Sequence, residues 1–301
     1  MNNQETYRQQ VALLLRIMPH VSGIKEFAIH GGTAINLFYK NMPRYSVDID
    51  ITYIPIEERE ISLRTINNRL AELKLTIEKH IPGVRVIHKT DVWKLLCSLH
   101  TATVKIEVNG TKRGTIGDIQ DLTLCKSAQI NFHTKVKAHV VSTTQLYGGK
   151  LAAALSRQHP RDLFDFCYMD CTFDEVRDGL LLALLGSDKP IVESLEPHDI
   201  DQKTAIDQQF EGMAEVPFTY ADYEQTRNRL HGFVNGGLTE TDRNFLLSFE
   251  KGSPDWSLCT AGDLGRFPAV QRKLQNIRKL KKLNPKKYEE GIEKLGKVLG
   301  K

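Results

Sequence analysis

Hydrophobic and polar residues follow different periods along the chain, and the first half is the richer in predicted strands. Apolar residues spaced three and four apart predict a helix over residues 1–20 and another over residues 57–80. Gly31-Gly32 ends the first strand, and Thr33 is expected to be the N-cap of a short helix. Alternating or short apolar runs predict strands over residues 25–30, 47–54, 84–88, 95–99 and 103–109.

The second half has the pattern of a helical domain. An Ala- and Leu-rich helix is predicted over residues 142–157, and Pro160 separates it from the next. The polar residues 187–214 predict an exposed connection. Further helices are expected at residues 180–185, near Tyr220, near Thr239 and after Pro268. We therefore expect an α+β chain of two domains, 1–145 and a mostly helical 146–301.

Composition places the chain among globular proteins, but its charge is unevenly distributed. Hydrophobic residues make up 41% and charged residues 26% of the 301 residues, which excludes the disordered and fibrous classes. The net charge is +4, yet residues 271–301 contain 11 basic and 3 acidic residues, so the preceding part is mildly acidic. This basic tail is either a solvated helix face or a surface for nucleic-acid phosphates.

The sequence also bears on the compartment. Its apolar runs fall short of the roughly 18 residues that a membrane span needs, and the polar start MNNQETYRQQ is unlike a signal peptide. Five scattered cysteines are typical of reduced thiols rather than of a disulfide framework. We expect a cytoplasmic protein with no membrane partner.

The segment from His30 to Asp50 combines a glycine turn with two carboxylates. Gly31 and Gly32 let the backbone approach a ligand closely because they have no Cβ, and a helix start offers its free N–H groups to a phosphate. Asp48 and Asp50 are two residues apart on a strand, so both side chains lie on one face. Because two such carboxylates repel each other without a cation, the pattern predicts Mg²⁺ or Mn²⁺.

A third carboxylate is needed if two metal ions support in-line phosphoryl displacement. Glu107 is the candidate, since it lies with Lys105 on the polar face of the strand at residues 103–109. The order strand, Gly-Gly, helix, DxD strand and Glu strand is typical of a nucleotidyltransferase core.

Two blocks of sequence resemble the AbiEii/AbiGii family of nucleotidyltransferase-like toxins. The first is HGGTA at residues 30–34 followed by RYSVDID at 44–50, and the second is GKL at 149–151 followed by RDLFD at 161–165. The resemblance covers roughly residues 20–170. It implies a polymerase-β-like nucleotidyltransferase fold, with a mixed sheet and flanking helices in an N-terminal core domain. It also implies Mg²⁺-dependent transfer of NMP from an NTP, and membership in a toxin–antitoxin or phage-defence pair.

The resemblance further implies roles for single residues. Metal is expected on Asp48, Asp50 and, with less family precedent for glutamate than for aspartate, Glu107. Lys150 and Asp162 are expected to complete the catalytic set. Phosphate is expected to contact Gly31, Gly32, Thr33 and Lys150.

For several of these residues the sequence leaves a structural alternative open. Arg44 and Ser46 flank the DxD strand and either donate to phosphate oxygens or order their own loop. Lys150 is either a phosphate contact or an ordinary exposed helix lysine. Asp162 and Asp165 either act in catalysis or pair locally within a helix.

The expected function is Mg²⁺-dependent transfer of NMP from an NTP to an acceptor hydroxyl, with the 3′ end of tRNA as the expected acceptor and a cognate antitoxin as partner. Two alternatives stay open. In the first, the acceptor of the nucleotidyl group is a protein or a small molecule. In the second, the chain is a non-catalytic nucleotide- or RNA-binding module. The basic tail favours an RNA partner.

Overall fold

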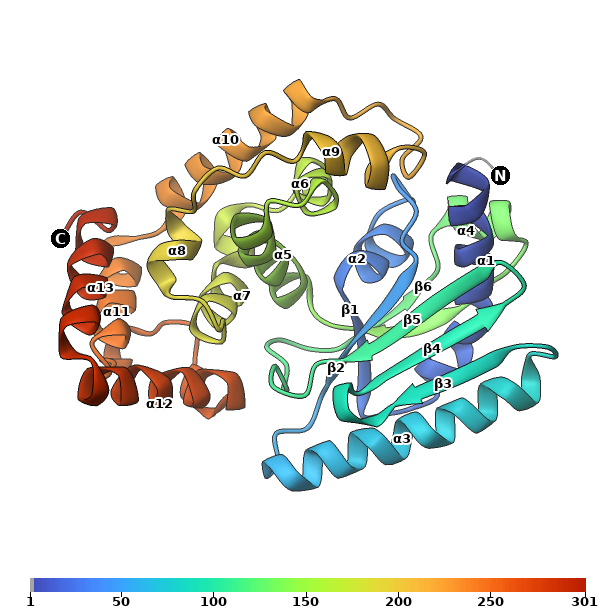
Figure 1. Cartoon of the computed structure of the whole chain (residues 1–301), viewed down its shortest axis with the longest axis horizontal. Helices are drawn as coiled ribbons and strands as arrows, with labels where there is room; N and C mark the ends of the chain where they lie inside the picture. The colour runs from blue at the N-terminus through green and yellow to red at the C-terminus, as the bar shows by residue number, and fades with distance from the viewer. Residues whose placement is uncertain (1–2) are drawn as a thin grey trace. The chain divides into compact units, whose positions relative to one another are not determined.

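In the computed structural model, which describes residues 3–301, the chain forms two units (Figure 1). The first contains the chain up to Ser142 together with Thr204–Phe218, and the second contains Thr143–Lys203 and Thr219–Lys301. The sequence predicts two continuous domains, 1–145 and 146–301, and does not foresee that residues 204–218 belong to the first unit. The predicted domain boundary therefore stays a prediction.

A seven-stranded mixed sheet forms the first unit, in the order β3-β4-β5-β2-β1-β7-β6. Strand β2 is antiparallel to β1 and parallel to β5, and β1 is parallel to β7. All five strands predicted from the sequence are present, within one or two residues of the predicted ends. The strands are β1 (Phe27–His30), β2 (Asp48–Tyr53), β3 (Arg85–Lys89), β4 (Lys94–Leu99), β5 (Ala102–Val108), β6 (Gln120–Thr123) and β7 (Lys137–Val140).

Two long helices cover one face of this sheet. Helix α1 (Asn3–Ser22) contacts β5 and β7, and α3 (Arg59–His80) contacts β3 and β4, alongside which it runs in Figure 1. Residues 1 and 2 of the helix predicted over 1–20 lie outside the described residues. The alternate positions Ile49 and Ile106 are buried, so period-two strands place Asp48, Asp50 and their neighbours on the other face.

Four elements of the first unit differ from the sequence prediction or are absent from it. Strands β6 and β7 and helix α4 (Lys126–Phe132) are short and lack a clear period. The helix expected from Thr33 begins earlier, as α2 (Gly31–Ala34), and continues as a π-helical turn, Ile35–Tyr39. Thr33 is therefore not the N-cap. Its hydroxyl faces β2 instead.

The second unit is helical. Its principal helices are α5 (Thr143–Arg157), α6 (Pro160–Cys167), α7 (Phe173–Leu185), α8 (Ile191–Leu195), α10 (Tyr220–Gly237), α11 (Glu240–Glu250), α12 (Pro268–Leu283) and α13 (Pro285–Val298). Helices α5 and α7 pack backbone to backbone, because a Cβ on Gly148 would overlap the main chain of Gly179. Gly148 is thus a packing residue inside α5.

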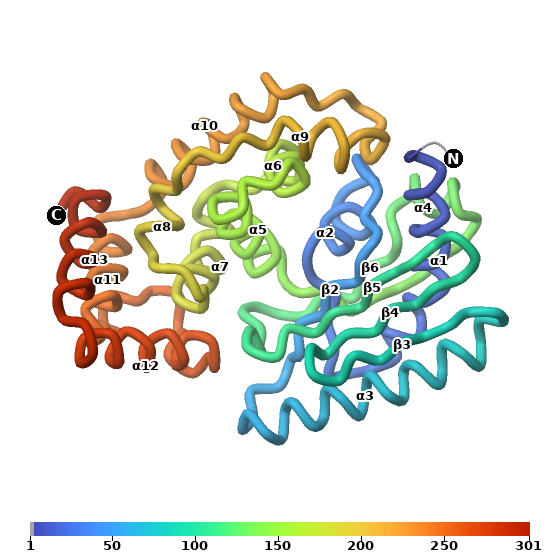
Figure 2. Tube along the Cα trace, in the orientation of Figure 1, coloured from blue at the N-terminus to red at the C-terminus, as the bar shows by residue number. Residues whose placement is uncertain are grey.

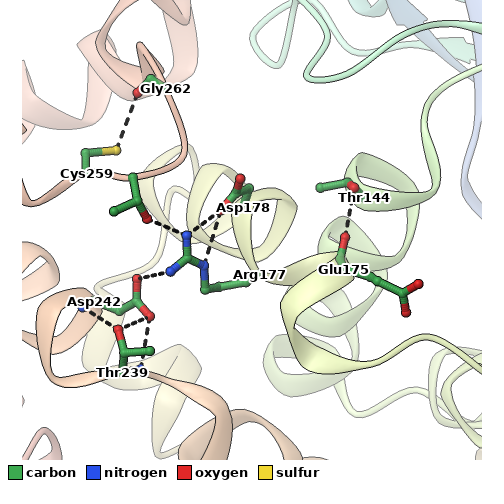
Figure 3. A network of polar contacts seen from close by, with 9 residues as sticks. Thr144, Glu175, Arg177, Asp178, Thr239, Asp242, Cys259 and Gly262 are labelled. Carbon is green, nitrogen blue, oxygen red and sulfur yellow. Dashed lines mark hydrogen bonds and ion pairs between the residues drawn. The ribbon is translucent and has the colours of Figure 1, made fainter.

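A polar network links α7 to the start of α11 (Figure 3). Arg177 donates to Asp178 at 3.0 Å and to Asp242 at 3.3 Å, and it also contacts Thr260. Asp242 caps α11 through the hydroxyl and amide of Thr239. These contacts satisfy a buried carboxylate and fix the helix start.

The exposed connection predicted over residues 187–214 is only partly correct, because most residues from 196 to 204 are exposed but the parts on either side contain buried residues. Ile191 and Leu195 of α8 are buried in the second unit. Farther along, residues 204–218 belong to the first unit, and Figure 2 shows this part of the trace. They include the end of α9 (Lys203–Ala205) and a π-helical turn, and Phe210 and Met213 are buried. The apolar residues of this segment lie at irregular spacing among acidic and amide side chains, so the local sequence shows no helix or strand period.

Among residues 3–301, no helix combines the length and the apolar character that crossing a membrane requires.

Candidate active site

The exposed side of the central strands gathers three carboxylates. In the register, Asp50 of β2 lies opposite His30 of β1 on one side and Glu107 of β5 on the other. Asp48, two residues before Asp50, projects to the same face and lies opposite Lys105. The alternation in the sequence places these side chains on one face, and the parallel pairing of β2 with β5 makes them neighbours.

The two glycines after β1 leave room for the side chains around them. Gly31 has a φ of +70°, and a Cβ there would overlap the carboxylate of Asp50. A Cβ on Gly32 would lie 2.7 Å from Arg44 Nη2 and 3.0 Å from Ser46 Oγ. The HGGTA and RYSVDID blocks therefore form a single structure, and neither glycine tolerates a side chain without movement of its neighbours.

Buried polar contacts hold the approach to β2. The hydroxyl of Thr33 donates to the carbonyl of Asp48 and lies 3.0 Å from Ser46 Oγ. Arg44 is buried and donates from Nη1 to the carbonyl of Tyr45 at 2.8 Å. These contacts are the loop-ordering alternative considered for Arg44 and Ser46, and they also aim the guanidinium at the backbone of Gly32.

The segment 204–218, which returns to the first unit, packs against the loop at residues 44–46. Tyr45 donates its backbone N–H to Met213 at 2.8 Å, and Arg44 forms a β-bridge with Ala214. The Met213 sulfur lies 3.9 Å from Arg44 Nη1. Nothing in the local sequence of this segment indicated such a role.

Two lysines share the carboxylate face. Glu107 pairs through one oxygen with Lys94 at 3.1 Å and through the other with Lys105 at 3.2 Å, and Lys105 also lies 3.7 Å from Asp48 Oδ2. Burial raises the pKa of Glu107, but hydrogen bonds from the two lysines outweigh it and hold that pKa below its usual range. Burial lowers the pKa of Lys105, and the nearby carboxylates outweigh this and raise it.

These ion pairs limit how the face can hold a metal. The part of the chain that the structure describes contains no group of three or more His, Cys, Asp or Glu side chains arranged to hold a metal. Both oxygens of Glu107 already accept from lysines. Asp48 and Asp50 fit a Mg²⁺ ion that takes one or two carboxylates from the protein and completes its shell with water and phosphate.

Lys150 and Asp162 form a separate cluster in the second unit. The amine of Lys150, in the middle of α5, lies 3.0 Å from Asp162 and 2.8 Å from Asp165, both of α6. All three side chains are buried, whereas Arg157, 2.9 Å from Asp162, is largely exposed. Burial raises the pKa of Asp162, but the charges of Lys150 and Arg157 outweigh it and lower that pKa.

The structure thus places the predicted site residues in two groups. The first, within the first unit, contains Gly31, Gly32, Thr33, Arg44, Ser46, Asp48, Asp50 and Glu107. The second contains Lys150 and Asp162, and Lys150 is not the exposed lysine of the structural alternative. Sequence reasoning missed Lys94, whose pairing with Glu107 follows from the antiparallel register of β4 and β5.

Comparisons with known proteins agree with this architecture. A search of curated protein sequences gives no significant match. Among solved structures, the chain is similar to MenT4, a nucleotidyltransferase toxin from Mycobacterium tuberculosis H37Rv, with a TM-score of 0.60 and 15% identity over 91% of this chain and 94% of that chain. The likeness confirms the predicted fold class. The family model for "Nucleotidyl transferase AbiEii toxin, Type IV TA system" matches residues 12–276 and confirms the resemblance seen in the two sequence blocks. The chain therefore belongs to the AbiEii family of nucleotidyl transferase toxins of type IV toxin–antitoxin systems.

Proposed function

We propose that this nucleotidyltransferase moves NMP from an NTP to the 3′ hydroxyl of an RNA, with the acceptor end of tRNA as the first candidate. The observation that carries the proposal is the placement of Asp48 and Asp50 on one face of β2, where the Asp50 carboxylate lies against Gly31. Membership in the family implies an NTP substrate and an antitoxin partner. A role in phage defence belongs to the same proposal.

Asp48 and Asp50 are the proposed ligands of a Mg²⁺ or Mn²⁺ ion. Such an ion stabilises charge on the phosphoryl oxygens during displacement of pyrophosphate. Glu107 is a weaker candidate than the sequence indicated, because each of its oxygens is held by a lysine. We therefore propose that the two aspartates bind the metal directly, and that Glu107 binds Lys94 and Lys105 and keeps them on this face.

Three neighbouring residues are proposed to receive the phosphates. Gly31 and Gly32 allow phosphate oxygens to approach the main chain, since no Cβ intervenes. Arg44 is already fixed by its bond to the Tyr45 carbonyl, so its guanidinium offers donors to phosphate at a low cost in side-chain entropy.

Roles for Lys150 and Asp162 also stay proposed. The two side chains pair with each other, so a phosphate contact by Lys150 would require its amine to exchange a carboxylate for a phosphate oxygen. Catalysis and stability are therefore both expected to depend on Lys150, and a variant there must be measured for both.

An RNA acceptor is supported by the surface of α12 and α13. Five exposed lysines flank the junction of these helices, and none forms an ion pair within residues 3–301: Lys279, Lys281, Lys282, Lys286 and Lys287. Two of them lie in the first turn of α13, which has no acidic residue, so they oppose the helix dipole. Because this placement disfavours the helix, we take it as support for phosphate binding. Replacing one such lysine should reduce the salt slope of RNA binding by about one.

The acceptor is tested by incubating the full chain with each labelled NTP, Mg²⁺ and total RNA, followed by separation of RNA from protein. We expect label on small RNA with one preferred NTP. Label on protein, on a small molecule, or nowhere would each refute RNA as the acceptor.

The site is tested in the same assay with Asp48→Asn and Asp50→Asn. We expect each to lower labelling by at least about 100-fold, as for the loss of an essential electrostatic group, with the melting temperature little changed because these side chains are partly exposed. Asp91→Asn, an exposed carboxylate elsewhere in the first unit, is the matched control and should label RNA as the wild type does. Full activity of Asp48→Asn would exclude the proposed site. Loss of growth inhibition in the same variant would link the chemistry to toxicity.

A further inference from the structure

Lys105 lies between two carboxylates of the polar face of β2 and β5, those of Asp48 and Glu107. Its amine is 3.7 Å from Asp48 Oδ2 and 3.2 Å from Glu107 Oε2, and its backbone lies opposite Asp48 in the sheet. The Lys94 amine also pairs with Glu107, at 3.1 Å, but makes no ion pair with Asp48 among the described residues. Both lysines therefore pair with Glu107, but only Lys105 also lies within 4 Å of Asp48.

The charge balance explains the presence of both lysines. Asp48, Asp50 and Glu107 bring three negative charges to adjacent positions on β2 and β5, and the lysines supply two positive ones. Without them, the carboxylates would repel one another in a partly buried setting. The lysines therefore stabilise the face when no metal is bound.

The same contact is unfavourable once a divalent cation occupies Asp48. An ammonium within 4 Å of that carboxylate would be close to the ion and would be repelled by it. Lys105 has a flexible stem and is about one third exposed at its side chain, 35%, so it is able to move away. Glu107 gives the amine a second partner to which it stays bound.

We propose that Lys105 is a resident counter-ion of Asp48 that a divalent metal must displace, and that Glu107 is a positioning residue that retains the displaced amine. The inference rests on the proposed function, because it takes Asp48 and Asp50 as the metal site. Metal binding and amine release are then coupled, and Lys105 sets the metal affinity of the empty enzyme. Lys94, which does not reach Asp48, has no part in this competition.

The test is a titration of the full chain with Mn²⁺ in the absence of nucleotide, in which free Mn²⁺ is measured by electron paramagnetic resonance. We expect Lys105→Met to bind Mn²⁺ roughly tenfold more tightly than the wild type, since a repulsion screened nearly as in water is worth about that factor at this distance. Lys94→Met is the matched control, because it also removes one lysine from Glu107, and its affinity should stay within about twofold of the wild type. Melting temperatures of the metal-free variants show that each is folded.

Each outcome separates the inference from the function on which it rests. Unchanged or weaker Mn²⁺ binding by Lys105→Met, or an equal gain in Lys94→Met, overturns the role of Lys105. If Lys105→Met keeps the wild-type Mn²⁺ affinity but weakens NTP binding, Lys105 contacts phosphate and the inference is wrong. Asp48→Asn tests the site itself, because wild-type Mn²⁺ affinity in that variant would refute the metal assignment whatever Lys105 does. If no variant binds Mn²⁺, including Lys105→Met, the counter-ion inference fails as well.

Discussion

Replacing Lys150 by methionine should destabilise the second unit strongly. The lysine side chain is 8% exposed, and its amine contacts Asp162, 5% exposed, and Asp165, fully buried at 0%. After Lys150→Met, Asp162 keeps Arg157 as a partner at 2.9 Å, but Asp165 loses the amine that lay 2.8 Å from it. Removing one partner of a buried ion pair costs about 3–5 kcal/mol of unfolding free energy, and we expect that range here.

Urea unfolding followed by tryptophan fluorescence measures this loss. Trp256 lies in the second unit and Trp93 in the first, so a Trp93→Phe background makes the signal report the second unit. For an m-value of about 2 kcal/mol/M, the loss corresponds to a midpoint lower by about 2 M urea. Arg157→Met is the matched control, because Arg157 is exposed at 63% and pairs with Asp162, and it should cost about 1 kcal/mol or less.

Two further measurements test whether the buried charge of Asp165 causes the loss of stability in Lys150→Met. Adding Asp165→Asn to Lys150→Met removes the buried charge, so the double variant should be more stable than the sum of the single effects by about 1–3 kcal/mol. Burial without the Lys150 amine disfavours the charged form of the Asp165 carboxyl, so the difference in unfolding free energy between Lys150→Met and the wild type should narrow as the pH falls toward about 4. A loss below 1 kcal/mol in Lys150→Met, or no coupling to Asp165, would show that this ion pair does not stabilise the second unit.

Three other predictions concern packing, titration and a buried hydroxyl. Gly179→Ala should lower the unfolding free energy by about 1–3 kcal/mol or more, because the new Cβ would overlap the carbonyl of Thr144. A Cβ on Gly232 in α10 meets no atom within 4 Å, so Gly232→Ala should be neutral or stabilising. Thermal melts compare the two variants, and equal effects would contradict the close packing of α5 and α7. Burial raises the pKa of Glu250, and Lys273 only partly opposes this, so the native state binds more protons than the unfolded state above the ordinary glutamate pKa of about 4.3. The wild type should therefore lose stability relative to Glu250→Gln as the pH rises from about 4 to 7, and unfolding curves in which the wild type keeps or gains stability relative to the variant over this range would contradict the raised pKa. Thr33→Val should cost about 1–3 kcal/mol in urea unfolding of the first unit, because it leaves the Asp48 carbonyl without the Thr33 hydroxyl, and a neutral effect would show that water replaces that bond.

Local patterns in the sequence were sufficient for the main strands and for the carboxylate face. Strand β5 alternates throughout and β2 alternates from Asp48 to Ile51, so the positions of Asp48, Asp50 and Glu107 follow from a period of two residues. Gly31 and Gly32 were recognisable as a close-approach turn for the same local reason. Short elements such as β6 and β7 were missed, because four residues carry too little of a period.

The identity of neighbours across the fold depended on tertiary structure. Lys94 meets Glu107 only because β4 and β5 pair in one particular register, and Gly148 meets Gly179 only because α5 and α7 cross there. Segment 204–218 looks like a polar linker because its apolar residues, Phe210 and Met213 among them, lie among acidic and amide side chains and follow no helix or strand period.

The sequence alone therefore determined which residue types face one another within an element, since backbone geometry repeats over two or 3.6 residues. Which side chains from distant elements come within 4 Å was decided by the packing of the whole chain. That packing puts Lys105 beside Asp48, buries Lys150 between two carboxylates, and sets Met213 behind Arg44. The physical reason is that short-range periodicity fixes a side chain's direction, whereas its partners depend on contacts between residues far apart in sequence.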